Sequence, residues 1–148
     1  MAETQTYANH TRWNPLFHFV VMPLLLLNFL SHLVWLFMAA PESGRKTLAF
    51  WTLLSFAFIL LGLVSRQQAL KAQDRTIRLE ERLRFKEILA TDLAQKASNL
   101  PTGQIIALRF APDEELTDLV SQVIDGKLNT SKEIKMAIKN WRGDDHRV

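Results

Sequence analysis

The chain has 148 residues, a formal net charge of +3 and no cysteine. Without cysteine it contains no disulfide, no thiolate nucleophile and no thiolate metal site. Hydrophobic residues make up 48% of the sequence and charged residues 22%, but the first half holds most of the apolar residues and the second half most of the charges. These averages therefore describe neither half.

The longest apolar stretch follows a polar amino-terminal arm, residues 1–15. Residues 16–40 contain no Asp, Glu, Lys or Arg. At about 1.5 Å rise per residue, a helix over this range is roughly 37 Å long, enough to cross a hydrocarbon core with tilt. The stretch is too long and too bulky for the core of a cleaved signal peptide, which predicts an uncleaved span. Pro23 lies inside it and predicts a kink.

A second uncharged stretch covers residues 47–65, close to the minimum length for crossing a membrane. The connection between the stretches is so short that the two helices must be antiparallel neighbours, which predicts a transmembrane hairpin over residues 16–65. Lys and Arg are more numerous after the second stretch than in the connection, which holds Arg45 and Lys46. The excess of positive charge places residues 66–148, and with two spans both termini, in the cytoplasm.

The charged half begins as a predicted helix. Residues 66–100 contain neither Gly nor Pro, so we expect one helix from about 47 to 97. Glu80 and Arg84 stand at the spacing of a stabilising pair on its surface. An apolar stripe at helical spacing then needs a partner; it consists of Phe85, Ile88, Leu89, Leu93, Ala97 and Leu100.

Three short helices are predicted to cover that stripe. Thr102 is the expected N-cap of the first, and Pro112 with the acids after it starts the second. Gly126 ends the second, and Thr130 or Ser131 caps the third. The predicted fold class is all-α: a two-helix transmembrane hairpin followed by a long cytoplasmic helix and a small bundle of short helices.

Two histidines of the first span, His18 and His32, are candidate cofactor ligands. On an ideal helix they share one face about 21 Å apart. Histidine is a common axial ligand of haem, so ligation of haem or chlorophyll is one hypothesis. The second span has no histidine, so one chain does not supply two such ligands to one haem. The alternative is that both are ordinary polar residues facing a bundle or cavity, with no cofactor at all.

Polar and aromatic residues near His32 are candidates for contact with another membrane subunit or a second copy. They are Asn28, Ser31 and Trp35 on the first span and Trp51 on the second. Polar groups in a bilayer need internal partners. The alternative is that these residues only cross-link the two helices of the hairpin.

Basic residues just after the second span are expected to meet lipid headgroups. They are Arg66, Lys71, Arg75 and Arg78. Each basic residue near an anionic surface contributes about 1 kcal/mol of attraction. Acidic residues alternate with these bases and no reading motif accompanies them, which argues against nucleic-acid binding.

No catalytic motif stands out. The acids Asp113, Glu114 and Glu115 are explained by a helix start. The cluster of Asp144, Asp145 and His146 lacks the spacing of a metal site. We therefore do not expect an enzyme.

Several stretches carry a family resemblance, the most specific being GQIIALRFA at 103–111, DEEL at 113–116 and IKNW at 138–141. Through them the chain resembles a family of small bacterial inner-membrane proteins, classed only as a domain of unknown function. The resemblance implies two spans, a helical tail and the bacterial inner membrane. It brings no activity with it.

Three functional hypotheses follow. The first is a non-enzymatic integral membrane protein that is a scaffold or accessory subunit of a larger complex. The second is a haem- or chlorophyll-ligating subunit of an electron-transfer complex. The third is a membrane-anchored docking module for a cytoplasmic protein. Membrane lipids and other membrane subunits are the expected partners.

Overall fold

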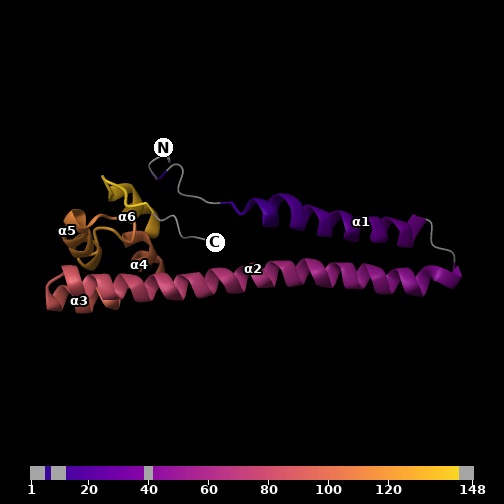
Figure 1. Ribbon diagram of the computed structural model, residues 1–148, viewed down its shortest axis with the longest axis horizontal. Helices are drawn as coiled ribbons and strands as arrows, with labels where there is room; N and C mark the ends of the chain where they lie inside the picture. The colour runs from indigo at the N-terminus through magenta and orange to yellow at the C-terminus, as the bar shows by residue number, and fades with distance from the viewer. Residues whose placement is uncertain (1–5, 8–12, 39–41, 144–148) are drawn as a thin grey trace. The chain divides into compact units, whose positions relative to one another are not determined.

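The computed structural model describes residues 6–7, 13–38 and 42–143, and these residues contain helices but no strand (Figure 1). This confirms the all-α prediction for the described part of the chain. Most of the predicted arm and the Asp144, Asp145 and His146 cluster lie outside the described residues. The chain divides into two compact units. We call Trp13–Leu70 the hairpin unit and the described part of Lys71–Val148 the tail unit.

The helices follow one another along the chain with short connections. Their bounds, in chain order, are η1 (Leu16–Val21, a π-helical turn), α1 (Met22–Met38), η2 (Glu42–Gly44, a 3₁₀ turn), α2 (Arg45–Ile88), α3 (Thr91–Ser98), α4 (Thr102–Leu108), α5 (Asp113–Ile124) and α6 (Ser131–Ala137).

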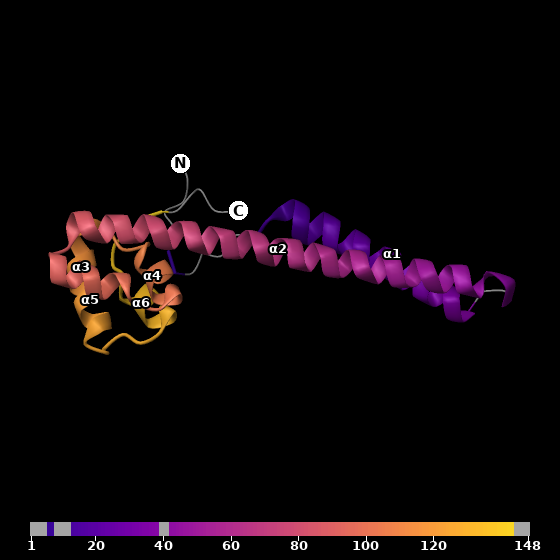
Figure 2. The same ribbon diagram turned by 90° about the horizontal axis from the view of Figure 1, so that it is seen from below.

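In the hairpin unit, α1 lies beside the first part of α2 (Figures 1 and 2). The Asn28 side-chain amide donates a hydrogen bond to Ser55 Oγ, with 2.9 Å between Nδ2 and Oγ. The rings of Phe29 and Phe56 lie 5.6 Å apart between centroids. One polar bond and an aromatic contact thus join the two helices.

The expected disturbance at Pro23 takes the form of a π-helical turn. The backbone N–H of Met22 donates to the carbonyl of Phe17, five residues earlier. Proline has no N–H for the carbonyl four residues before it, and its ring crowds that carbonyl. A wider turn just before Pro23 relieves this conflict. His18 lies in this turn, so the ideal-helix calculation that put it on the face of His32 does not apply.

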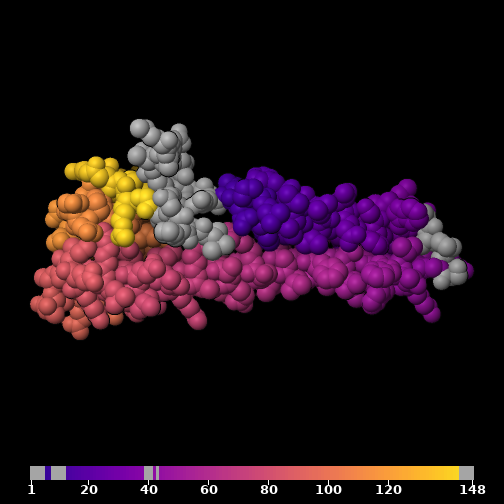
Figure 3. All heavy atoms as spheres, in the orientation of Figure 1, coloured from indigo at the N-terminus to yellow at the C-terminus, as the bar shows by residue number. Residues whose placement is uncertain are grey.

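Two helical stretches, Leu16–Met38 and Arg45–Ile88, are long and apolar enough to span a membrane. No residue of α1 is buried. Large apolar side chains are exposed along both helices; among them are Leu24, Leu27, Phe37, Leu53 and Leu61. In Figure 3 the atoms of α1 lie along those of the first part of α2. The hairpin unit therefore covers very little of its apolar surface by itself.

The predicted single helix to residue 97 is wrong, because α2 ends at Ile88 and α3 begins at Thr91. Ala90 between them has an extended backbone, with ψ of 145°. The break lets the apolar stripe fold back into one core. Phe85 enters that core from the end of α2, Leu89 from the break itself, and Ala94 and Ala97 from α3.

The core of the tail unit is built from α3, α4, α5 and α6 against the end of α2. Its largest fully buried side chains are Phe85, Phe110, Ile105, Leu108, Leu116, Ile134 and Val120. The predicted partners of the stripe are therefore the ones that the structure brings to it.

The ends of the short helices follow their predicted signals, except at the start of α4. Gly126 ends α5 with φ of +74°, and Thr130 caps α6 in a capping box with Glu133. Thr102 does not cap α4, since Pro101 occupies that position and Thr102 is already helical. The last helix ends at Ala137, and the extended Ile138 begins the segment that carries Trp141 to within 4.8 Å of the Phe110 ring.

Glu115 fastens this last segment to α5. Its carboxylate accepts hydrogen bonds from the backbone N–H groups of Lys139 and Asn140, both at 3.0 Å, and from the Asn140 side chain at 2.8 Å. These bonds, led by that from Lys139, hold the pKa of Glu115 below its usual value of 4.5.

We predict that the tail unit loses stability in acid because Glu115 becomes protonated there. A carboxyl whose folded pKa is lowered stabilises the fold above pH 4.5, and this is lost as the pH falls through the folded pKa. In Glu115→Gln the free energy of unfolding of the tail will be lower at pH 7 and will fall less in acid. Urea titrations followed by circular dichroism in detergent measure it. Glu114→Gln, at an exposed neighbour, is the control and should keep the wild-type slope.

Candidate functional site

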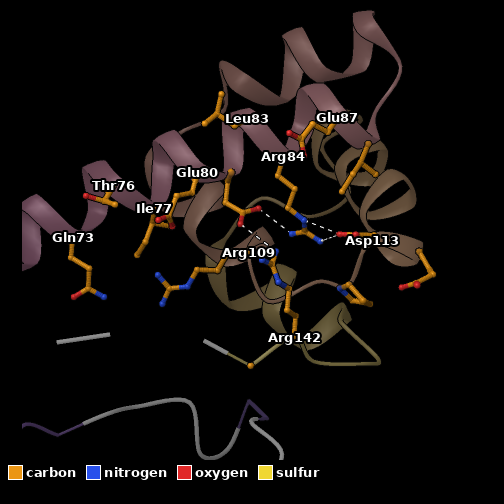
Figure 4. Close-up of a pocket in the computed structure, with 15 residues that line it drawn as sticks. Gln73, Thr76, Ile77, Glu80, Leu83, Arg84, Glu87, Arg109, Asp113 and Arg142 are labelled. Atoms are coloured by element: carbon orange, nitrogen blue, oxygen red, sulfur yellow. Dashed lines mark hydrogen bonds and ion pairs between the residues drawn. The ribbon is translucent and has the colours of Figure 1, made fainter. Parts of the chain in front are cut away.

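A concave surface in the tail unit forms a groove of about 1050 Å³. One wall is α2, and the other is formed by the end of α4, the start of α5 and the segment after α6 (Figure 4). Its apolar lining comes from Ile77, Leu83, Ile88 and Pro112. Acidic and basic side chains alternate with these residues, so the groove is both apolar and charged.

A buried carboxylate, that of Glu81, lies at the base of the groove. Glu81 is only 5% exposed. Arg84 Nη1 donates to Glu81 Oε2 at 3.1 Å, and Arg142 Nη1 lies 3.7 Å from Glu81 Oε1. A buried charge needs such partners, because taking it out of water is costly.

Arg84 connects α2 to the start of α5. Its Nε donates to Asp113 Oδ1 at 2.9 Å, and its Nη2 donates to the same oxygen and, at 2.7 Å, to the carbonyl of Ala111. The predicted pair of Glu80 and Arg84 is therefore wrong: Arg84 turns toward the core and takes Glu81 and Asp113 as its partners (Figure 4).

Burial raises the pKa of the Glu81 carboxyl above its usual value of 4.5, and the charge of Arg84 is the largest influence against that rise. A carboxyl with a raised folded pKa contributes most to stability below pH 4.5, and this contribution falls as the pH rises through the folded pKa. At neutral pH the charged form of Glu81 therefore depends on its guanidinium neighbours.

The groove offers apolar and charged groups that can bind a partner. Among the described residues, no three His, Cys, Asp or Glu side chains come together as a metal site. The exposed rim carries Glu80, Glu87 and Glu114. The exposed Arg142 lines the groove as well. Apolar side chains beside charges of both signs suit a partner segment that combines apolar and charged residues.

The candidate ligand His32 lies in the hairpin unit beside a pocket of about 360 Å³. Its Nδ1 is 2.8 Å from the carbonyl oxygen of Asn28, and His18 makes the same contact with Asn14. Because a carbonyl oxygen only accepts, Nδ1 carries the proton and Nε2 of the neutral ring keeps its lone pair. No described contact joins the two histidines.

The other residues predicted at the hairpin have different environments. Asn28 bonds Ser55, which is the cross-link that the alternative reading expected, and Ser31 Oγ donates to the carbonyl of Leu27 on its own helix. Trp35 and Trp51 are 62% and 48% exposed. Of these four predicted contact residues, the two tryptophans therefore offer the large exposed surfaces.

The predicted headgroup residues follow the apolar part of α2. Lys71 and Arg75 are exposed, and Arg66 and Arg78 are half-buried. Two of the four thus present their charges fully to the surroundings.

Sequence reasoning missed the cluster of Glu81, Arg84, Asp113 and Arg142. Its members are up to 61 positions apart by residue number, from 81 to 142, and only the fold brings them together. The one available signal was Glu81 on the apolar side of an otherwise charged helix.

Comparison with known proteins identifies the family. A model of DUF6526, a family of unknown function, matches residues 1–148, so the chain belongs to this family. No curated protein and no solved structure matches the chain.

We predict that Arg84→Met destabilises the tail unit by about 3–5 kcal/mol, because it leaves the Glu81 carboxylate buried without its main partner. Urea unfolding at pH 7, followed by circular dichroism in detergent, measures the loss. The double variant Glu81→Leu with Arg84→Met should recover most of it, since the buried charge is then gone. Lys132→Met, at an exposed position, is the control. Equal losses in the single and double variants would contradict this account.

Proposed function

We propose that this member of DUF6526 is a non-enzymatic integral membrane protein of the bacterial inner membrane, a scaffold or accessory subunit of a larger assembly. In this proposal the hairpin unit crosses the membrane twice and the tail unit lies in the cytoplasm. The observation that carries the proposal is the outward-facing apolar surface of α1 and of the first part of α2.

That surface argues for lipid as the surrounding medium. Leu24, Leu27 and Phe37 on α1 are 60%, 63% and 78% exposed, and Leu53 and Leu61 on α2 are 68% and 62% exposed. Soluble proteins rarely expose continuous apolar surface beyond a few hundred Å². The internal backbone bonds of a helix also meet the requirement that a bilayer imposes on a spanning segment.

The distribution of positive charge supports the orientation. Lys71 and Arg75 follow the apolar part of α2 and are exposed, where they suit the cytoplasmic leaflet. Arg45 and Lys46 at the other end of the span are fewer than the basic residues that follow it. This asymmetry favours a cytoplasmic tail.

The groove of the tail unit supports the role in assembly. Its wall is held in place by the Arg84 contacts with Glu81 and Asp113, so the surface is ordered before any partner arrives. Its apolar side chains lie beside charged groups of both signs, which favours a partner with complementary charges. The exposed Trp35 and Trp51 offer a second surface within the membrane.

Single introduced cysteines test the predicted topology, because the sequence itself contains no cysteine. The protein should stay in the membrane pellet after an alkaline carbonate wash. In intact cells a membrane-impermeant maleimide should label Lys46→Cys, and it should label Glu114→Cys only after permeabilisation. Native-size analysis of the wild-type protein after gentle detergent extraction should find additional polypeptides. A carbonate-soluble protein would contradict the membrane assignment, and Glu114→Cys labelled in intact cells would contradict the cytoplasmic orientation of the tail.

A second candidate function is ligation of haem or chlorophyll by His32. The observation that favours it is the contact of Nδ1 with the Asn28 carbonyl, because such bonds orient histidine ligands and leave Nε2 for a metal. Trp51 and Phe58 line the neighbouring pocket and provide apolar walls. A second ligand would come from another chain.

For this candidate we predict a visible absorption band in protein purified from native membranes. His32→Ala should remove the band, because it removes the ligand, whereas Ser31→Ala should keep it, since Ser31 bonds only its own helix in the described contacts. A colourless wild-type preparation would exclude the candidate and would leave the scaffold proposal untouched.

A further inference from the structure

Beyond the membrane-length part, α2 has two faces with different environments. Ile77, Glu81, Arg84 and Phe85 point into the tail unit and are buried. The opposite face carries a row at alternating spacings of four and three, which we call the seam: Ala72, Thr76, Leu79, Leu83 and Lys86. At about 100° per residue, the centres of the two faces are nearly opposite on the helix.

The seam is exposed in the single chain. Leu79 and Leu83 are 61% and 53% exposed, and Leu83 points away from the side where Arg84 enters the core (Figure 4). Rows at alternating spacings of three and four are the pattern of helices that wind around each other, and Leu79 and Leu83 are the large apolar members of this row. The tail core uses the other face. Thr76 and Leu83 also line the edge of the groove but stay exposed there, so the row remains open to a partner outside the chain.

The charges beside the seam identify the partner. Arg75 and Arg82 flank one side, and Glu80 and Glu87 flank the other. Each arginine stands five residues before a glutamate, which is the offset at which flanking residues of two parallel, in-register helices meet. Arg75 of one copy then faces Glu80 of the other, and Arg82 faces Glu87, twice each by symmetry.

The same charges disfavour the antiparallel arrangement. There each flank would meet the identical flank of the other copy, so that arginine would face arginine and glutamate would face glutamate.

Arg82 donates its Nε and Nη2 groups to the Ser98 carbonyl at 3.0 and 2.7 Å, which leaves Nη1 for the partner. Two copies inserted in one membrane with the same topology are parallel already.

We propose that residues 72–87 of α2 form a short parallel coiled coil with the same segment of a second copy of this chain. The inference rests on the proposed membrane anchoring, because a seam with only two leucines is too short to hold two chains together in dilute solution. Confinement to one membrane raises the effective concentration of the two helices and makes so short a contact sufficient.

Disulfide cross-linking in membranes tests the seam directly, since the natural chain has no cysteine. After mild oxidation, Leu79→Cys should give a covalent dimer at least about tenfold more efficiently than Lys71→Cys, because only seam positions bring the two Cβ atoms within disulfide distance. Lys71 is an exposed residue of the same helix and serves as the matched control. Equal cross-linking at both positions, or cross-linking of Leu79→Cys to another polypeptide, would overturn the proposal.

Charge exchange in the Leu79→Cys background tests the parallel register. Arg75→Glu alone, or Glu80→Arg alone, puts like charges together at two places and should reduce the dimer about tenfold. Co-expression of differently tagged Arg75→Glu and Glu80→Arg chains should restore cross-linking between the two tags, because all their pairs are then opposite in sign. Unchanged cross-linking in the single variants, or no restoration in the mixture, would overturn the register.

Each sample is also scored for retention in the membrane after carbonate washing. A protein that is retained but not cross-linked would overturn the coiled coil alone. A protein lost from the membrane would overturn the proposed anchoring on which the coiled coil rests.

Discussion

Apolar side chains that face outward along α1 and the first part of α2 impose the constraint on which the other features depend. No residue of α1 is buried, and the described polar bond between the two helices joins only Asn28 and Ser55. Hydrophobic burial within the chain therefore contributes little to the hairpin unit. Its helices instead suit a solvent in which apolar surface costs nothing and backbone groups must be paired internally, as in a bilayer.

The tail unit differs from the hairpin unit, because its apolar side chains fill a core of its own. Phe85, Ile105 and Leu116 are fully buried, yet the same core encloses the carboxylate of Glu81. A buried carboxylate with its ion partners gives little net stability, but few arrangements of the helices satisfy its hydrogen bonds. Arg84 reaches Glu81 and Asp113 together only if α2 and the start of α5 lie as they do. The ion cluster thus specifies how the short helices pack.

The sequence predicted those features that depend on neighbouring residues. The apolar stretches, the proline before α5, the left-handed Gly126 and the Thr130 cap all act within a few positions of themselves. The break after Ile88 and the partners of Arg84 were not predictable in this way. The break has no Gly or Pro, and it lets Leu89 and Ala94 reach the same core. Asp113, 29 residues from Arg84, becomes its partner only through the fold.

The two faces of α2 explain why the seam is free. Residues that point into the tail unit repeat at three and four positions, and so do the residues of the seam, so both faces are built on one helical period. A helix that packed only against the tail core would carry charged residues on the opposite, solvent-exposed face. Here Leu79 and Leu83 occupy that face, while the charges stand beside it with arginines on one flank and glutamates on the other. A lipid surface would not select this separation of signs, because it attracts the basic flank and repels the acidic one. A second parallel helix uses both flanks at once.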